Sequence, residues 1–422
     1  MKILWVKAGK ILPVDTGGKI RSYNLLRQLA SRHETVLLSY YGGARDESYE
    51  SEVERHLPGA VTVHTDAPDS FARQALDYLL RLPSPAPYAV RKFASPAVQK
   101  LVRDWDAARR FDVAVCDFLS ASLNFPAETR TPTVLFQHNV ESALWQRQAR
   151  HAPDIFRGVA FKIEAAKMTR YERDAVRRFR HVIAVSENDR ELMSKMTDAS
   201  RITVVPTGVD IKKYSSGGED SHAVEEGRSP NTPLVVFLGS MDWEPNIDGV
   251  EYFCREVWPR VSEAVPGARF RVVGRDPHPR VRRLASETIE VTGTVPSVVE
   301  HLREADVVVV PLRVGGGTRL KIFEAMAVGK AVVSTTVGAE GLDVTHGEDI
   351  LLADDAASFA ESVTALLRDA TRRETLGRAA AALAARYDWS VIARRFEDVL
   401  ARAAGVEDAA GEAERLAETV GV

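Results

Sequence analysis

Short apolar runs alternate with longer amphipathic stretches along most of the chain. The runs are rich in Val, Ile and Leu, which is typical of strands buried on both faces of a parallel sheet. Seven lie at residues 2–8, 35–40, 61–64, 113–116, 133–136, 182–186 and 202–206, and five more at 234–238, 270–273, 289–292, 307–310 and 331–335. Stretches with helical spacing separate many of them, among them residues 71–82, 96–109 and 161–179. Strands that alternate with helices predict an α/β fold with parallel, doubly wound sheets.

One stretch interrupts this pattern near the middle of the chain. Residues 214–233 read YSSGGEDSHAVEEGRSPNTP, which has no hydrophobic period and is rich in Ser, Gly, Pro and Glu. Such a composition indicates a linker, which we place at residues 213–233. We therefore expect two Rossmann-like domains, residues 1–212 and 234–387, that face one cleft and bind ligands beyond the carboxyl ends of their strands. The Ala- and Glu-rich residues 406–422 are expected to form a loose tail.

The composition narrows the class of protein. A chain of 422 residues is long enough for two cores, and a net charge of −3 argues against bulk binding of nucleic acid. Cys116 and Cys254 lie far apart in apolar surroundings, which indicates reduced cysteines rather than a disulfide or a metal site. The sequence has neither a run of about 18 apolar residues nor a signal-peptide pattern. We therefore expect a cytoplasmic protein, soluble or peripheral on a membrane.

The strongest chemical signal follows the predicted strand at residues 307–310. The loop and the helical turn after it contain Gly315, Gly316, Gly317, Thr318, Arg319 and Lys321. The glycines let the backbone turn tightly and approach a ligand, and Thr318 is placed to cap the helix. Exposed amides at a helix N-terminus, with two cations in the first turn, suit an anion such as a diphosphate.

Glu324 decides between a phosphate site and a plain structural turn. A glycine loop between a strand and a helix fits either interpretation about equally well. Glu324, however, is the one acid in an otherwise apolar helical stretch, so it should meet a cation or a pair of ligand hydroxyls. A glycine loop for phosphates followed by a carboxylate for a ribose predicts a nucleotide site.

These motifs resemble the retaining glycosyltransferases of family 4. The resemblance covers nearly the whole chain, and its motifs are GGGTRLKIFEAMAVGKAVVST (315–335), FLGSMDWEPNIDGVEYF (237–253), VVGRDP (272–277) and VTGTVPSVVEHLREADVVVVPL (291–312). It implies the GT-B fold, a nucleotide-sugar donor, and catalysis that needs neither a metal nor another cofactor. It also implies that the last helix, residues 388–405, completes the N-terminal domain.

In the N-terminal domain the resemblance singles out three residues. Gly17 and Gly18 correspond to a glycine loop that lies against the donor diphosphate; the alternative is a helix turn with no ligand. His138 follows an apolar strand at a place where related enzymes contact the donor sugar, and the backbone carbonyl there assists the attack of the acceptor. The alternative is a hydrogen-bonded structural histidine.

In the C-terminal domain the resemblance implies a set of donor contacts. They are Arg275, Thr294, Val295, Gly316, Gly317, Thr318, Glu324 and Glu340. Thr294 and Val295 belong to the segment whose backbone meets the nucleobase, and Glu324 corresponds to the acid that holds the ribose. Arg275 is either a contact to the base or phosphates or the partner of a neighbour such as Asp276. Glu340 either lines the sugar pocket or is an exposed loop acid.

The sequence departs from the family pattern at three positions. Gly316 stands where the first of two acids is usual, and Ser240 and Asp248 stand where an Arg and a Lys usually bind the diphosphate. We expect Arg319 and Lys321, together with the glycine amides, to neutralise the phosphates instead.

The resemblance implies a retaining sugar transfer in which His138, Arg319, Lys321 and Glu324 form the catalytic site. The implied acceptor is a glycan or a lipid-linked molecule of cell-surface polysaccharide synthesis, either exopolysaccharide or lipopolysaccharide. Two other functions remain open: a nucleotide-sugar 2-epimerase of the same fold, and an inactive protein that binds nucleotide sugars.

Residues 141–180 raise the question of a membrane partner. They contain ten Lys or Arg residues and five acids. This excess suits peripheral docking on the anionic inner face of the plasma membrane. It equally suits a solvated helix face with ion pairs between successive turns.

Overall fold

The computed structural model describes residues 1–65, 71–150, 155–215, 232–314 and 320–406. They form two compact units, which we treat separately. Unit 1 comprises Met1–Pro206 and the residues from Ser390 onward, and unit 2 comprises Thr207–Trp389.

The first boundary between the units precedes residue 212, where the sequence predicted it. The segment after Pro206 is bound into unit 2 by two contacts. Val209 pairs with Asp388 through an isolated parallel bridge. Gly208 lies so close to the Trp389 ring that a Cβ at this position would be 2.6 Å from it. The last residues of the predicted first domain therefore already belong to the second core.

The sheet of unit 1 contains seven described parallel strands in the order β3-β2-β1-β4-β5-β6-β7. They are β1 (Lys2–Ala8), β2 (Glu34–Tyr41), β3 (Val61–His64), β4 (Val113–Asp117), β5 (Thr133–Phe136), β6 (His181–Ala184) and β7 (Ile202–Val204). The chain runs outward from β1 to β3 and then returns to β4 on the other side of β1. The sheet therefore has its topological switch point between β1 and β4, where ligands of such sheets bind.

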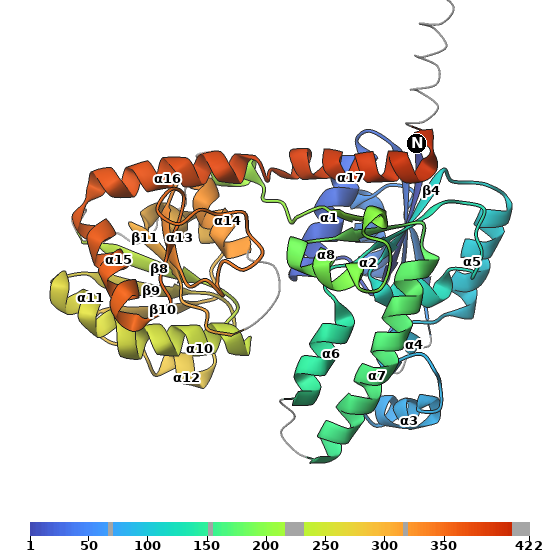
Figure 1. Ribbon diagram of the computed structural model, residues 1–422, viewed down its shortest axis with the longest axis horizontal. Helices are drawn as coiled ribbons and strands as arrows, with labels where there is room; N and C mark the ends of the chain where they lie inside the picture. The colour runs from blue at the N-terminus through green and yellow to red at the C-terminus, as the bar shows by residue number, and fades with distance from the viewer. Residues whose placement is uncertain (66–70, 151–154, 216–231, 315–319, 407–422) are drawn as a thin grey trace, which may run out of the picture. The chain divides into compact units, whose positions relative to one another are not determined.

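Helices cover both faces of this sheet; in Figure 1, α1 and α8 lie on one side of the strands and α5 on the other. The helices of unit 1 are α1 (Gly17–Ala30), α2 (Glu47–His56), α3 (Phe71–Arg81), α4 (Tyr88–Arg91), α5 (Pro96–Ala107), α6 (Glu141–Arg150), α7 (Ile155–Arg178), α8 (Glu187–Ser194) and, across the unit boundary, α17 (Trp389–Ala404). Two short 3-10 helices, η1 (Leu119–Asn124) and η2 (Ala199–Arg201), complete it.

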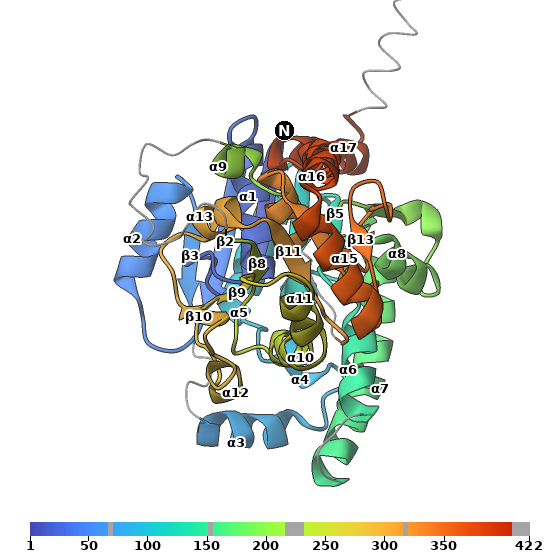
Figure 2. The same ribbon diagram turned by 90° about the vertical axis from the view of Figure 1, so that its left-hand side faces the viewer.

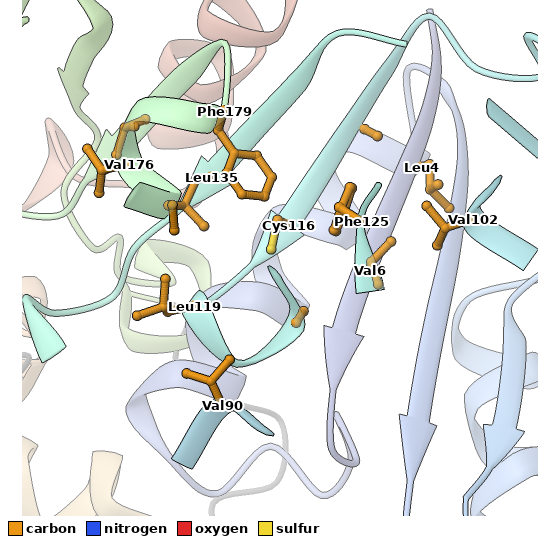
Figure 3. Packing of buried hydrophobic residues seen from close by; sticks show 14 of the residues in the cluster. Leu4, Val6, Val90, Val102, Cys116, Leu119, Phe125, Leu135, Val176 and Phe179 are labelled. Carbon is orange, nitrogen blue, oxygen red and sulfur yellow. The ribbon is translucent and has the colours of Figure 1, made fainter. Parts of the chain in front are cut away.

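The central strand β1 is buried on both faces. Leu4 and Val6 belong to the hydrophobic cluster that includes Val102 of α5 and Phe179 at the end of α7 (Figure 3). Trp5 points to the opposite face, where its ring stacks on Phe396 of α17 with centroids 5.4 Å apart. Burial on both faces explains why the strand reads as a continuous apolar run.

Unit 2 contains six described parallel strands in the order β10-β9-β8-β11-β12-β13, with the switch point between β8 and β11. They are β8 (Leu234–Leu238), β9 (Arg269–Val273), β10 (Ile289–Gly293), β11 (Val307–Val310), β12 (Ala331–Ser334) and β13 (Leu351–Leu352). The helices are α9 (Ile211–Ser215), α10 (Glu244–Tyr252), the π-helix η3 (Phe253–Val257), α11 (Trp258–Ala264), α12 (Pro279–Arg282), α13 (Val298–Glu304), α14 (Leu320–Ala327), α15 (Ala356–Arg368) and α16 (Ala370–Ala385).

The predicted fold class, α/β with two parallel sheets, is confirmed. The structure differs from the prediction at the hairpin of α6 and α7. The pattern indicated a single helix at residues 161–179, whereas α7 begins at Ile155 and α6 precedes it. The N-terminus of α6 is held by Glu172 of α7, which accepts hydrogen bonds from the backbone amides of Glu141 and Ser142 at 2.8 and 2.9 Å. A cap supplied from 30 residues away leaves no local signal in the sequence.

Two further observations concern the predicted class of protein. Cys116 and Cys254 are both buried and free. None of the described helices combines the length and apolar character that crossing a bilayer requires.

Candidate functional site

In unit 2 the chain segments after the neighbouring strands β8 and β9 approach each other very closely, beside the switch point between β8 and β11. A Cβ on Gly274, which follows β9, would lie 1.7 Å from the carbonyl oxygen of Gly239, which follows β8. Only glycine fits there, because the neighbouring atom is backbone and cannot move aside. The close approach brings the loop after β8 and the residue after Gly274 together.

Lys321 is held over the end of β8 by a residue from another element. Its Nζ donates a hydrogen bond to Asn246 Oδ1 of α10 at 2.7 Å and lies 4.4 Å from the centroid of the Phe237 ring. Asn246 is itself fixed, because its Nδ2 donates to the carbonyl oxygen of Ser240 at 2.7 Å. A cation in the first turn of α14 is thereby positioned at the switch point of the sheet.

Arg275 reaches the same loop from β9. Its Nε donates to the Ser240 hydroxyl at 3.0 Å, and its carbonyl oxygen accepts from the amide of Met241 at 3.0 Å. Within the described ranges no ion pair joins Arg275 to Asp276, the alternative that the sequence left open. Ser240 thus orients the Arg275 guanidinium, and Asn246 orients the Lys321 ammonium group. The loop after β8 and the start of α10 position these two cations, which belong to other elements.

Asp248 has a different task from the one its place in the sequence suggested. Its two carboxylate oxygens accept a bidentate pair of hydrogen bonds from Arg313 at 2.6 and 3.1 Å. The guanidinium also lies 4.7 Å from the centroid of the Tyr252 ring. Arg313 closely precedes the glycine-rich segment, so this pair ties the entrance of that segment to α10.

Glu324 lies half-buried on α14 and has a phenol as its partner. The hydroxyl of Tyr214 donates to Glu324 Oε1 at 2.7 Å. Burial raises the pKa of Tyr214, and the nearby Glu324 carboxylate raises it further, so the phenol stays protonated and donates. The hydrogen bond gives the Glu324 carboxylate a fixed direction.

The other predicted residues of unit 2 fall into two groups. Thr294 is exposed and Val295 is half-buried after β10, and Glu340 is exposed in the segment between β12 and β13. The second group, Gly315, Gly316, Gly317, Thr318 and Arg319, lies outside the described residues. Their predicted contact with phosphates stays a prediction.

In unit 1 the predicted residues Gly18 and His138 are brought together. Gly18 lies in the first turn of α1, and a Cβ added to it would be 3.2 Å from His138 Nδ1. The imidazole is also packed against Phe136 and Phe118, with ring centroids 4.5 and 5.2 Å away. Gly18 therefore leaves the space that this histidine needs beside the helix N-terminus.

A buried charge cluster at the same switch point was missed by the sequence analysis. Lys7 at the end of β1 donates to Asp117 Oδ2, at the end of β4, at 2.9 Å, and to Ser22 Oγ at 3.1 Å. Trp5 Nε1 donates to the same Asp117 oxygen at 2.9 Å. The available signal was the position of Lys7 and Asp117, because polar residues that end buried neighbouring strands meet at a switch point.

His138 completes this cluster through an unusual contact. Its Nε2 lies 3.0 Å from Asp117 Oδ1, but both atoms are buried and neither makes an aligned hydrogen bond with the described residues. Burial lowers the pKa of His138 to about 4 in spite of the neighbouring carboxylate. Burial alone would raise the pKa of Asp117, but the attraction of Lys7 and His138 outweighs it and holds the pKa below its ordinary value. At neutral pH the imidazole is uncharged beside a carboxylate.

Arg21 adds a second buried cation one turn after Gly18. It is 2% exposed, and burial lowers its pKa to about 10, which leaves it charged at neutral pH. The residues after β5 are held by Glu172, which accepts from Gln137 Nε2 at 3.0 Å as well as from the start of α6. The loop that carries His138 is therefore anchored on both sides.

In the part of the chain that the structure describes, no group of three or more His, Cys, Asp or Glu side chains is arranged to hold a metal ion.

Comparison with known proteins places the chain in a family. Residues 16–213 match the family described as Glycosyltransferase Family 4, and residues 232–369 match the family described as Glycosyl transferases group 1. The chain is a member of these glycosyltransferase families. Apart from Trp5, Lys7 and Tyr214, the residues described at the two sites lie within these matches.

Curated relatives agree with this assignment, and a solved structure shows the fold. The chain is 30% identical over 218 residues to a phosphatidyl-myo-inositol mannosyltransferase of Mycobacterium leprae, covering 50% of this chain and 56% of that one. It is 31% identical over 229 residues to a D-inositol 3-phosphate glycosyltransferase of Nocardia farcinica, covering 50% of each. The match spans about half the length of these relatives. The crystal structure of Anabaena HepE in complex with UDP superposes with a TM-score of 0.65 at 18% identity, over 95% of this chain and 100% of that one. The fold is therefore GT-B, as the resemblance implied.

Proposed function

We propose that this glycosyltransferase moves a sugar from a nucleoside diphosphate donor to a glycan or lipid-linked acceptor, with retention of the anomeric configuration. The observation that carries the proposal is the Lys321–Asn246 contact at the switch point of unit 2, beside the Ser240–Arg275 contact. Two oriented cations at the carboxyl ends of β8 and β9 suit the diphosphate of a donor.

The charge that develops during transfer explains why these cations matter. When the glycosidic bond of the donor breaks, the diphosphate leaves with additional negative charge. Lys321 and Arg275 stabilise that charge, and because their partners already fix them, little reorganisation accompanies the reaction. We propose that the reaction needs no metal. We also propose that Arg319 helps to neutralise the charge of the leaving diphosphate. The half-buried Glu324 accepts hydrogen bonds from the ribose hydroxyls.

In unit 1, His138 is assigned to the donor sugar, and Gly17 and Gly18 are assigned to the donor diphosphate. Gly17 and Gly18 offer the amides at the N-terminus of the 14-residue helix α1. His138 Nε2 and Asp117 Oδ1 are buried polar atoms without an aligned partner among the described residues. The Asp117 carboxylate, 3.0 Å from Nε2, orients the imidazole, and the proposed contact with the donor sugar is made by the part of His138, 7% of the residue, that is exposed.

The acceptor and the place of action are inferred from the relatives. Both curated relatives are named for inositol-containing molecules, one of them a phosphatidyl lipid. We extend this to a lipid-linked or glycan acceptor of cell-surface polysaccharide synthesis, used at the inner face of the plasma membrane.

A thermal-shift panel of nucleoside diphosphates and nucleotide sugars tests the donor site. We expect one nucleotide to stabilise the protein, and Lys321→Ala and Glu324→Ala to abolish that shift. Arg283→Ala is the matched control, because Arg283 is an exposed cation of unit 2 on the segment after α12. A shift that survives Lys321→Ala unchanged would refute the assignment of the donor site.

Product analysis then separates the transferase from the two other functions. A transferase releases the nucleoside diphosphate only as sugar appears on an acceptor, and NMR of the new linkage reports retention. An epimerase changes the sugar with no acceptor present. A protein that binds the donor and never releases diphosphate with any acceptor is an inactive binder.

A further inference from the structure

Helix α3 presents a stripe of exposed leucines. The exposed fractions of Leu76, Leu79 and Leu80 are 59%, 62% and 71%. Spacings of three and four residues place these side chains on one face of the helix. A single exposed leucine is ordinary, but three on one stripe form an apolar patch that soluble surfaces usually avoid.

The opposite face of α3 is the one that packs against unit 1. Tyr78 contacts the Tyr88 ring edge to face with centroids 5.2 Å apart. Asp77 pairs with Arg81 at 2.6 Å, and Arg81 donates to the carbonyl oxygen of Arg91 at 3.1 Å. Aromatic and polar side chains thus attach the helix to the rest of unit 1, and its leucines face outward. An ordinary surface helix packs its apolar face on the core and exposes its polar face.

The first turns of α7 present two further exposed apolar side chains at the same end of unit 1. Val159 and Ile163, four residues apart, are 53% and 41% exposed. Glu164, the next residue, is buried and accepts from the amide of Tyr88 at 2.7 Å, and Lys167 donates to the carbonyl oxygen of Leu82 at 2.6 Å. These contacts hold α7 against the connection between α3 and α4. In both views α3 and the start of α7 lie at the same end of unit 1 (Figures 1 and 2).

The exposed charges at this end are positive. Exposed basic side chains lie on α4 and directly after it, on the first turns of α7 and on the last turns of α6: Arg91, Lys92, Arg157, Lys162, Arg147 and Arg150. Among the described side chains of α3, α4, residues 147–150 and residues 157–167, the acids are Asp77 and Glu164. Both are engaged within the protein, as described above. Exposed leucines together with exposed cations suit a partner that has an apolar interior and a negatively charged surface.

We propose that this surface, formed by Leu76, Leu79, Leu80, Val159, Ile163 and the surrounding cations, docks on an anionic lipid bilayer. The leucines enter the boundary between headgroups and acyl chains, and the cations contact lipid phosphates. The inference rests on the proposed function in one respect: a lipid-linked acceptor gives the enzyme a reason to bind there. It locates peripheral binding on α3 and the start of α7, rather than on the basic residues of the α6–α7 hairpin alone.

Vesicle sedimentation of the full chain tests the proposal. We expect wild type to bind phosphatidylcholine vesicles that contain phosphatidylglycerol, and to bind less at high salt. Leu79→Ser/Leu80→Ser should weaken binding by about tenfold or more, whereas Leu79→Met/Leu80→Met should retain it. Lys162→Glu should weaken binding to the anionic vesicles by about fivefold or more at low salt, and the control Arg103→Glu, on α5, should not.

Three outcomes would overturn the inference. Wild type that ignores anionic vesicles contradicts it directly. Equal binding by wild type and Leu79→Ser/Leu80→Ser shows that another surface docks. A wild-type dimer in light scattering that the serine variant converts to a monomer assigns the leucines to a second copy of the chain.

The thermal shift produced by the donor, measured on the same samples, separates this inference from the proposed function. If the donor still stabilises the protein but vesicles do not bind, the docking surface alone is refuted. If vesicles bind but the donor gives no thermal shift, the donor site alone is refuted.

Discussion

Asn246 Oδ1 accepts a hydrogen bond from Lys321 Nζ at 2.7 Å, although 75 residues separate the two in sequence. The contact joins α10 to the first turn of α14 at the switch point of unit 2. Under the proposed function, this contact accounts for the absence of two cations usual in the family, because Asn246 and Ser240 orient cations that come from other elements.

Asn246→Ala should therefore weaken nucleoside diphosphate binding by roughly tenfold, because Lys321 loses the hydrogen bond that directs it. Isothermal titration with the nucleotide identified by the panel measures the effect. Asn246→Asp is the informative companion. It keeps an oxygen acceptor but adds a carboxylate beside the ammonium group, so we expect weaker binding than in wild type here too. Unchanged affinity for the nucleotide in both variants would mean that Lys321 does not depend on Asn246 for its position.

The role of Glu324 can be tested by removing the hydroxyls that it is proposed to bind. Glu324→Gln should weaken binding of the ordinary nucleotide by about tenfold and leave binding of its 2′,3′-dideoxy analogue nearly unchanged. Tyr214→Phe, which alters the partner of Glu324 but not its charge, should have the smaller effect. Equal losses for both nucleotides would place the ribose elsewhere.

The contact between Gly18 and His138 predicts a thermodynamic coupling. Gly18→Ala should lower the free energy of unfolding by roughly 1–2 kcal/mol, because its Cβ would press on an imidazole already confined by Phe118 and Phe136. In a His138→Ala background the added methyl group has room, so most of that cost should vanish. Urea denaturation of the four proteins gives the coupling. Additive effects would mean that the ring moves aside freely.

Glu141 should make the stability depend on pH. Burial, together with the neighbouring Glu172, raises the pKa of Glu141 from 4.5 to about 7. Between these values the folded chain keeps a proton that the unfolded chain has released, so this group makes the protein less stable as pH rises. His138 acts in the opposite direction: its pKa falls from 6.5 to about 4, so stability is lost as pH falls through that window.

Glu141→Gln isolates the first effect, since the contribution of His138 is common to both proteins. The variant should exceed wild type by roughly 1–2 kcal/mol above pH 7 and by little below pH 4.5. Denaturant midpoints at the two pH values measure this. The same difference at both pH values would show that the pKa of Glu141 is equal in the folded and unfolded chains.

The fold was predictable because buried parallel strands leave an unmistakable apolar pattern. β1, β3, β5, β8 and β11 have the predicted limits, whereas β13 is too short, at two residues, to give a signal. The site was predictable only in part. Lys321 and Glu324 stand out as charges in an apolar helix. Asn246 and Tyr214 matter because they orient Lys321 and Glu324, and the hydrophobic pattern of a sequence does not show how one side chain orients another.

The same reason explains the leucines of α3. A helical stripe of leucines predicts a face that packs on the core. Whether it does so depends on Tyr78 and Asp77, which attach the helix by its other side.

The stacking of Phe396 on Trp5 has a consequence for how the protein is made. The strands of unit 1 leave the ribosome first, but the ring that covers one face of their central strand is translated almost 400 residues later. Unit 2, by contrast, is contiguous and can close its sheet while synthesis continues. A ribosome stalled before α17 would therefore expose a nascent chain with a finished second unit and an uncovered Trp5, which is a surface for chaperones to recognise.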